Sequence, residues 1–483
     1  MSRMPSMIRP LSFASALAGL ALFAPGIAQA QQPTQPLPLP ATPKAFEFDA
    51  REAFRIAAKE PEVAELTADR GQLSTRAEVR DDGRWQVGFF DGDEEVVQVH
   101  VDGVSGEVAE VWTGIQVAWT MARGYPEQFG HALNAPWVWI PMALVFFLGL
   151  LDWRKPLRIA HLDLLVLLSF GISHVFFNNA DIGVSVPLAY PPLLYLLGRM
   201  LWVGFRGGGV GLRPSAPRML LVIVCLFAIA FRITLNTVDS GVIDVGYAGV
   251  VGADRITDGD PIYGDGIFPE GVGQGDTYGP ANYLAYVPFE LALPWTGEWD
   301  SLPSAHAAAV FFDLATVLGL FVLGLRAGRA SKRDPVAKKR LRAAFSHPLR
   351  ALGNSQGQRL GLVLAFAWLT YPYTAFASQS NSNDSLVAAF LVWGLVALGS
   401  PLGRGLLVGL AAMVKFAPLA LVPLYATGKR GLAGRFEGRR PIVPTLAAGA
   451  AALFAIALML AHPAIDPGLA TFYERTIESQ LDR

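Results

Sequence analysis

The sequence predicts a mainly α-helical protein in which a bundle of transmembrane helices follows a small extracytoplasmic α+β domain. Hydrophobic residues make up 52% of the 483 residues, charged residues make up 16%, and the mean hydropathy is +0.37. Apolar runs near the roughly 20-residue length of a membrane-spanning helix recur from Pro136 onward. The net charge of −1 provides no basic surface for nucleic acid, so we expect no nucleic-acid partner.

Residues 1–30 have the three parts of a secretory signal peptide. Two arginines precede an apolar run from Phe13 to Phe23, and Ala28-Gln29-Ala30 has the small residues of a cleavage site. A retained N-terminal anchor is the alternative, but the apolar run is short for a span. In both cases residues 31–44, a Pro- and Gln-rich linker, begin outside the cytoplasm.

Residues 45–113 predict a short helix followed by antiparallel strands. Asp49 and Glu52 have the spacing of a capping box at the start of the helix. Apolar and polar residues then alternate in two runs joined by Asp91-Gly92, and a third strand follows Gly106. The apolar strand positions are Trp85, Val87 and Phe89, then Val97, Val99 and Val101, then Val108 and Val111.

This order of elements, with an Ala-rich helix, Trp85 and a turn from Asp102 to Gly106, resembles the PepSY domain. The resemblance implies a module that binds or inhibits partners and has no catalytic role. We expect residues 114–135 to connect this domain to the membrane part of the chain.

Apolar segments in the rest of the chain predict membrane spans. Basic residues after the first, third and fifth of them predict cytoplasmic loops. This orientation puts the loops at 178–185, 236–303 and 378–384 on the outer side, together with the small domain. The predicted spans are 136–153, 159–177, 186–203, 219–235, 304–325, 360–377, 385–399 and 441–462.

Two further apolar segments are predicted not to cross. Residues 281–294 fit a juxtamembrane helix at the outer face, because the charges on either side agree only if this segment stays there. Residues 406–425 have basic residues at both ends, so we expect a re-entrant pair of half-helices broken near Lys415-Phe-Ala-Pro418. A continuous span that violates the charge rule is the alternative.

The outer loop at 236–303 is rich in carboxylates, aromatic residues and glycines. We expect most of its acidic side chains to be solvated and to have no role in catalysis. Its acids include Asp239, Asp244, Asp254, Asp258, Asp260, Asp265, Glu270 and Asp276, opposed by Arg255.

Segments of the outer loops and the re-entrant region together resemble the C-class glycosyltransferases, in particular the polyprenol-phosphate-dependent mannosyl- and arabinosyltransferases. In that family an outer-loop acid, a Tyr three residues later and a Gly-x-Pro-x-Tyr segment act at the sugar-transfer site. The matching segments here are Asp244-Val-Gly-Tyr247, Gly259-Asp-Pro-Ile-Tyr263, Tyr278-Gly-Pro280, Asn381-Ser-Asn383-Asp384 and Lys415-Phe-Ala-Pro418.

The resemblance covers residues 219–483 and leaves the three earlier spans, within 136–218, unexplained. It implies transfer of a hexose or pentose from a polyprenyl-phosphate carrier to a lipid or glycan acceptor on the extracytoplasmic face. Relatives continue into further helices past the end of this chain, so the C-terminus is a candidate truncation. A non-enzymatic receptor or transporter is the alternative, and a transporter would need polar groups along a path to both sides.

The expected chemistry needs a base for the acceptor hydroxyl and a cation for the departing phosphate. Asp244 is the candidate base, a role that typically contributes about 10²- to 10⁴-fold. A solvated aspartate at a helix end is the alternative reading, and Asp239 is the nearest substitute.

Lys415 is the candidate phosphate-binding cation. A lysine near mid-membrane costs roughly 2.5–3.5 kcal/mol, so it should face a cavity or a counter-charge. Snorkelling to the interface is the alternative. Arg232, near the outer end of its predicted span, is a second candidate to bind the phosphate for the same reason. The alternative is that it pairs with an acid of the outer loop.

Tyr247, Tyr263 and Tyr278 are predicted to shape the sugar pocket. For Asn381, Asn383 and Asp384 we expect capping of the following helix first and substrate hydrogen bonding second. We expect no cofactor. A divalent cation at Asp258, Asp260 and Asp265 is not supported, because the loop lacks the ligand spacing of a calcium loop. Asp163 and Asp313 are predicted to pair within the bundle.

Overall fold

The structure is a computed structural model, and it describes part of the chain. The predicted signal peptide, most of the linker, residues 331–354 of the predicted cytoplasmic loop after the fifth span, and the acids Asp265 and Glu270 lie outside the described residues. The described residues are 42–80, 83–92, 94–118, 122–123, 130–206, 214–264, 266–268, 275–297, 302–330, 355–427, 442–463 and 468–478.

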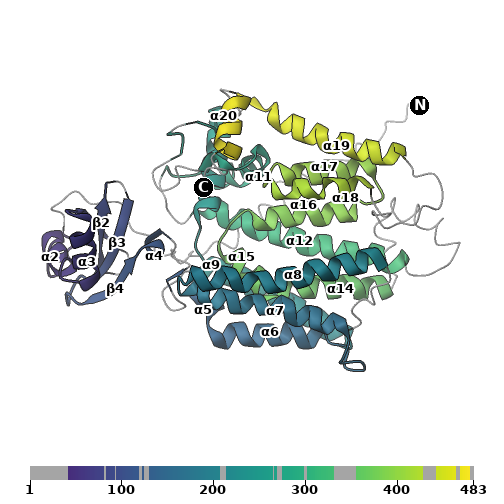
Figure 1. The fold of residues 1–483 in the computed structure, drawn as a ribbon, viewed down its shortest axis with the longest axis horizontal. Helices are drawn as coiled ribbons and strands as arrows, with labels where there is room; N and C mark the ends of the chain where they lie inside the picture. The colour runs from purple at the N-terminus through teal and green to yellow at the C-terminus, as the bar shows by residue number, and fades with distance from the viewer. Residues whose placement is uncertain are drawn as a thin grey trace, which may run out of the picture.

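The N-terminal part folds as two helices against one face of a four-stranded antiparallel sheet with strand order β1-β2-β3-β4 (Figure 1). The Glu52 backbone N–H donates to Asp49 Oδ1 at 3.0 Å, which confirms the predicted helix start. Alternation places Trp85, Val87 and Val99 in the core beneath the helices. The elements are α2 (Ala50–Ala57), α3 (Pro61–Arg70), β1 (Ser74–Val79), β2 (Arg84–Asp91), β3 (Glu94–Asp102) and β4 (Val108–Thr113).

Helix α3 and strand β1 were not predicted. In β1 Ala77 is the one buried residue, because the sequence of this strand lacks the strong apolar alternation of β2 and β3. Pairing with β2, in register from Ser74 opposite Phe90 to Val79 opposite Trp85, makes it an edge strand. The PepSY resemblance stays a prediction.

The membrane part is a bundle of helices that run side by side (Figure 1). In the described residues α7, α8, α9, α12 and α19 are long and apolar enough to cross a membrane. The bundle helices are α6 (Pro136–Leu150), α7 (Ile159–Asn178), α8 (Ile182–Arg206), α9 (Arg218–Val238), α12 (Pro303–Ala330), α14 (Ser355–Thr370), α15 (Pro372–Gln379), α16 (Asp384–Val396) and α19 (Ile442–Leu460).

Three predicted spans form helices that are too short or too bent to be single candidate spans. The segment at 360–377 bends by 59° between α14 and α15, so it is a sixth candidate span only if the bent pair counts as one. Pro372 begins α15, and proline breaks a helix because it lacks the N–H and crowds the preceding turn. Helices α6 and α16 end at Leu150 and Val396, earlier than predicted.

The segment predicted to re-enter turns back on itself. It forms α17 (Pro401–Ala412), a break, the 3₁₀ turn η4 (Ala417–Leu421) and α18 (Val422–Thr427). Arg404 at the start of α17 donates to the carbonyl oxygens of Tyr425 at 2.6 Å and Ala426 at 3.0 Å. The two ends of the segment therefore meet, and the break lies where it was predicted.

Close contact between small residues joins this hairpin to α19. A Cβ on Gly405 would lie 2.2 Å from the Ala448 carbonyl oxygen, and one on Gly409 would lie 2.7 Å from that of Ala452. Such backbone proximity gives the packing and dispersion contacts that hold helices together in lipid. The hairpin and α19 are thus one packed unit.

The charges predicted inside the bundle are paired. Asp163 accepts from Arg199 at 3.0 Å, as expected. Arg232 makes two bonds to Asp313, at 2.8 and 3.0 Å, and both side chains are at least 95% buried. The Trp368 indole donates to the same carboxylate at 2.7 Å. This buried pair connects α9, α12 and α14.

Removing the carboxylate of Asp313 should strongly destabilise the bundle. In Asp313→Ala the Arg232 charge stays buried without its partner, which typically costs about 3–5 kcal/mol. Thermal unfolding in detergent micelles measures the loss. The double variant Arg232→Met, Asp313→Leu should recover most of it, and equal losses in the single and double variants would contradict the buried-charge explanation.

The stability of the N-terminal domain should depend on pH through Glu95 of β3. Burial raises the pKa of Glu95 from 4.5 to about 7, against a hydrogen bond from Gln98 that lowers it. The folded state therefore holds a proton that the unfolded state has released, so this stabilisation is complete below pH 4.5 and is lost as the pH rises through 7.

Glu95→Gln should therefore gain stability relative to wild type as the pH rises from 4.5 to 8. We expect a gain of ~1–2 kcal/mol, because one pKa unit corresponds to about 1.4 kcal/mol and the side chain retains some solvent contact. Hydrogen exchange of the β2 and β3 amides in the intact protein, compared at each pH, measures it. A constant difference across this range would refute the assignment.

Candidate functional site

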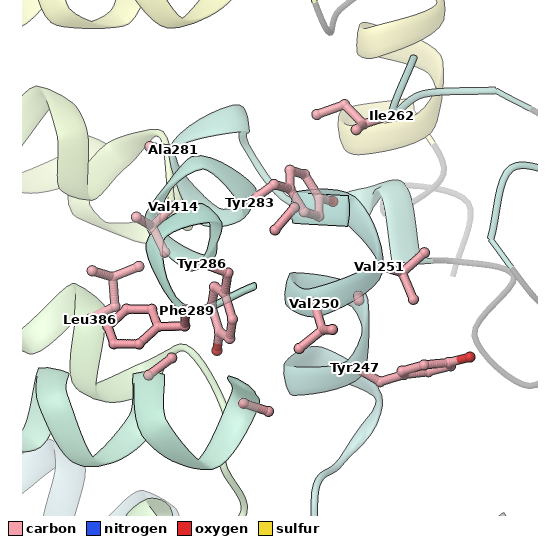
Figure 2. Packing of buried hydrophobic residues seen from close by; sticks show 14 of the residues in the cluster. Tyr247, Val250, Val251, Ile262, Ala281, Tyr283, Tyr286, Phe289, Leu386 and Val414 are labelled. Carbon is pink, nitrogen blue, oxygen red and sulfur yellow. The ribbon is translucent and has the colours of Figure 1, made fainter. Parts of the chain in front are cut away.

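The outer loop folds into two helices packed against each other, α10 (Asp244–Asp258) and α11 (Pro280–Glu290). Tyr283 and Tyr286 of α11 cover Gly252 and Gly249 of α10 (Figure 2). A Cβ at these glycines would lie 2.2 Å and 2.8 Å from the two rings, so only glycine permits this approach. The segment predicted not to cross forms α11, whose 11 residues are too short to span a bilayer, and its position at the outer face stays a prediction.

A buried polar network positions the start of α10. The Asn236 side chain donates to Asn381 Oδ1 at 2.7 Å, and Asn381 donates to the Gly241 carbonyl oxygen at 2.8 Å and to Ser240 Oγ at 3.1 Å. His306 Nδ1 lies 3.0 Å from the Asn236 carbonyl oxygen. These contacts tie together the end of α9, the beginning of α12 and the second outer loop.

Asp244 is the first residue of α10 and lies beside this network. The Ile243 N–H donates to the Ser380 carbonyl oxygen at 3.1 Å, and Gly246 faces the backbone of Asn381. The Asp244 side chain is exposed, and within the described residues it makes no hydrogen bond or ion pair. A helix N-terminus favours a negative charge, so the carboxylate is held in place electrostatically and stays open to a substrate.

Asp239, the substitute base, has a structural role. Its carboxylate accepts from the Ala132 N–H at 2.8 Å and lies 2.8 Å from His131 Nδ1. Burial raises its pKa, while those two partners lower it. These contacts fasten helix α5 (His131–Asn134) to the outer loop, which leaves Asp244 as the free carboxylate of the two.

Lys415 lies in the break between α17 and η4, and its counter-charge is Asp384 at 2.5 Å. The side chains are 33% and 53% exposed, so solvent reaches the pair. The break is docked against α11, because the Ala281 N–H donates to the Met413 carbonyl oxygen at 3.1 Å. A Cβ on Gly279 would lie 2.1 Å from the same oxygen.

The capping role expected for Asn383 is wrong. Asn383 occupies the N-cap position of α16, but its side chain makes no capping hydrogen bond. Its Nδ2 instead donates to Asn282 Oδ1 of α11 at 2.8 Å, and both residues are fully buried. The Asn383 side chain therefore binds α11 and does not cap α16. The Asn381 side chain is hydrogen-bonded within the buried polar network at the start of α10.

Two of the three predicted pocket tyrosines lie in the core. Tyr263 is fully buried, donates to the Tyr278 carbonyl oxygen at 2.8 Å, and has a pKa that burial raises well above its ordinary value. Tyr247 is 2% exposed and packs against Trp295 on the side of α10 away from α11 (Figure 2). Tyr278 is the half-buried member of the three.

The structure does not bring Arg232 to Lys415, because the guanidinium group of Arg232 is bound to Asp313.

The structural role of a second buried carboxylate, that of Asp276, was not predicted from the sequence. Asp276 is fully buried, accepts from Arg475 at 2.6 and 3.1 Å, and accepts from the Gly264 N–H at 3.2 Å. It clamps the loop to the C-terminal elements α20 (Leu469–Tyr473) and η7 (Glu474–Glu478).

The remaining acids form no metal cluster in the part of the chain that the structure describes. Asp260 lies 4.0 Å from Arg255 and is exposed, and Asp258 is the last residue of α10. Among the predicted site residues, the structure therefore gathers Asp244, Tyr278, Asn383, Asp384 and Lys415 around the second outer loop and the break.

The bundle of apolar helices places the chain in the class of multi-pass membrane proteins. Within that class, residues 277–479 match the model of GT87, glycosyltransferase family 87, which confirms the resemblance seen in the sequence. Comparison with curated proteins gave no match, and neither did comparison with solved structures. The matched segment contains Tyr278, Asn383, Asp384 and Lys415, and it begins after Asp244, Tyr247 and Tyr263.

Docking of the break against α11 can be tested at Gly279. In Gly279→Ala the new methyl group would collide with the Met413 backbone, so we expect a loss of ~1–3 kcal/mol in stability from overpacking. Thermal unfolding in micelles measures the effect. Gly449→Ala in α19 is the matched control, because a Cβ there meets open space. If both variants unfold with wild-type midpoints, the close approach is not maintained in the protein.

Proposed function

We propose that the protein moves a hexose or pentose from a polyprenyl-phosphate carrier to a lipid or glycan hydroxyl on the extracytoplasmic face of the membrane. One observation carries the proposal. Asp244, whose carboxylate makes no hydrogen bond or ion pair with a described residue, follows Ile243, which is hydrogen-bonded to the first residue of the short loop 380–384. The solvent-accessible pair Lys415–Asp384 lies at the last residue of the same loop. Sugar transfer from a phosphate carrier needs a base and a phosphate-binding cation, and this cluster offers a candidate for each.

The reaction is a single displacement at the anomeric carbon. The acceptor oxygen bonds to this carbon as the bond to the carrier phosphate breaks, and the configuration inverts. Asp244 takes the proton of the acceptor hydroxyl, which makes the oxygen a better nucleophile. Lys415 exchanges Asp384 for a phosphate oxygen and stabilises the charge that develops on the leaving group. Tyr278 borders the sugar.

The small domain is assigned to the same extracytoplasmic side. This assignment depends on the basic residues of the predicted cytoplasmic loops. A PepSY-type module there would bind a ligand or partner in the cell envelope, next to the face on which transfer takes place.

The first test is turnover of a panel of polyprenyl-phosphate sugars by the purified protein in lipid nanodiscs. Asp244→Asn should lower turnover about 10²-fold or more, the usual effect of a general base, and should leave carrier binding unchanged. Lys415→Gln should weaken carrier binding about tenfold, since it removes a charge-assisted contact to phosphate.

Asp258→Asn is the matched control, because it neutralises an exposed carboxylate at the other end of the same helix. It should keep wild-type turnover. The proposal fails if the wild-type protein neither binds nor consumes a carrier, and the assignment of the base fails if Asp244→Asn turns over normally.

A further inference from the structure

Three buried polar atoms next to the Asp384–Lys415 pair lack a hydrogen-bond partner among the described residues. They are the amide nitrogen of Asn282, the amide oxygen of Asn383 and the hydroxyl group of Tyr286. All three side chains are 0% exposed. Asn282 and Tyr286 lie one turn apart on α11, and Asn383 is bonded to Asn282 at 2.8 Å.

The surroundings make this arrangement unfavourable for folding alone. Tyr286 packs with apolar neighbours that include Phe289, Leu386 and Val414 (Figure 2). A buried polar atom without a partner costs free energy, and native proteins leave few of them. Two facing amides can make two reciprocal hydrogen bonds, but this pair makes only one. Leucine and phenylalanine would pack here at lower cost.

The unused groups specify a type of ligand. Asn282 offers amide donors, Asn383 offers a carbonyl acceptor, and the Tyr286 hydroxyl can both donate and accept. A phosphate would be repelled by the Asn383 oxygen, and a cation would find no match in the Asn282 nitrogen. A neutral hydroxyl group satisfies both amides, since it also donates one hydrogen bond and accepts others.

The three groups lie on the elements that hold the ion pair. Asn383 directly precedes Asp384, and α11 is bonded through Ala281 to Met413, two residues before Lys415. The charge of Asp384 also adds to the effect of burial in raising the pKa of Tyr286. In the proposed reaction Lys415 turns to a phosphate, which leaves Asp384, the neighbour of Asn383, without its partner.

We propose that Asn282, Asn383 and Tyr286 form the inner wall of the sugar subsite and bind ring hydroxyl groups of the transferred sugar. The inference rests on the proposed function. It makes these three side chains the determinants of the specificity for the donor sugar. The phosphate group, by contrast, is bound by Lys415.

The test uses Tyr286→Phe and Asn282→Leu in the nanodisc turnover assay. Tyr286→Phe removes a hydroxyl group that has no hydrogen-bond partner among the described residues, so its thermal stability should stay equal or rise. Asn282→Leu also removes the acceptor of the Asn383 side chain, so its thermal stability should fall. For the parent donor, kcat/KM should fall about tenfold per lost hydrogen bond. With a deoxy-sugar donor that lacks the bound hydroxyl, variant and wild type should perform equally.

Asn178→Leu is the matched control, because the Asn178 amide oxygen in α7 is also buried and unpartnered within the described part of the chain. It should not change kcat/KM for any donor. If the wild type turns over but Tyr286→Phe and Asn282→Leu match it on every donor, the sugar wall is refuted while the proposed function stands. A wild type that consumes no donor removes the proposed function and this inference with it.

Discussion

The site depends on the buried hydrogen bonds of Asn381. This side chain accepts from Asn236 at the end of α9 and donates to Ser240 and Gly241 ahead of α10. Its backbone adopts a left-handed conformation, with φ of 50°, that places the loop against Gly246. Each donor and acceptor in this network is shielded from water, so losing one would leave others unpaired at high cost. The position of Asp244 follows from this constraint.

The elements that we propose to meet the substrate are held by contacts that are partly open to solvent. The break at residues 413–416 is docked by backbone contacts to α11, and its lysine is held by a carboxylate that solvent reaches. Exposed ion pairs contribute little to stability, so exchanging Asp384 for a phosphate is inexpensive. The buried Arg232–Asp313 pair, in contrast, stabilises the bundle where no ligand needs to enter.

Much of the fold could be predicted from local signals. Apolar length indicated the helices, alternation indicated β2 and β3, and charge at both ends indicated the hairpin of α17 and α18. Asn383 was misjudged, because N-cap statistics describe an isolated helix end and α11 offers its side chain a closer partner. Tyr247 and Tyr263 were assigned to a pocket, but both are buried in the core, where Tyr247 packs against Trp295 and Tyr263 against Tyr283 and Phe472. No pattern in the sequence signalled the contact between Asp276 and Arg475, which are 199 residues apart.

The sequence by itself determined that this is a helical membrane protein with an acidic loop at residues 236–303, because hydropathy and charge are properties of single segments. The sequence also singled out Asp244 and Lys415. A carboxylate in the family pattern and a lysine among apolar residues can each be recognised from the local sequence, without knowing the partner of either residue. Only the tertiary structure decided which groups meet. Lys415 pairs with Asp384, Asn282 with Asn383 and Arg232 with Asp313, because helices far apart in the chain pack together and bring these side chains within hydrogen-bond distance.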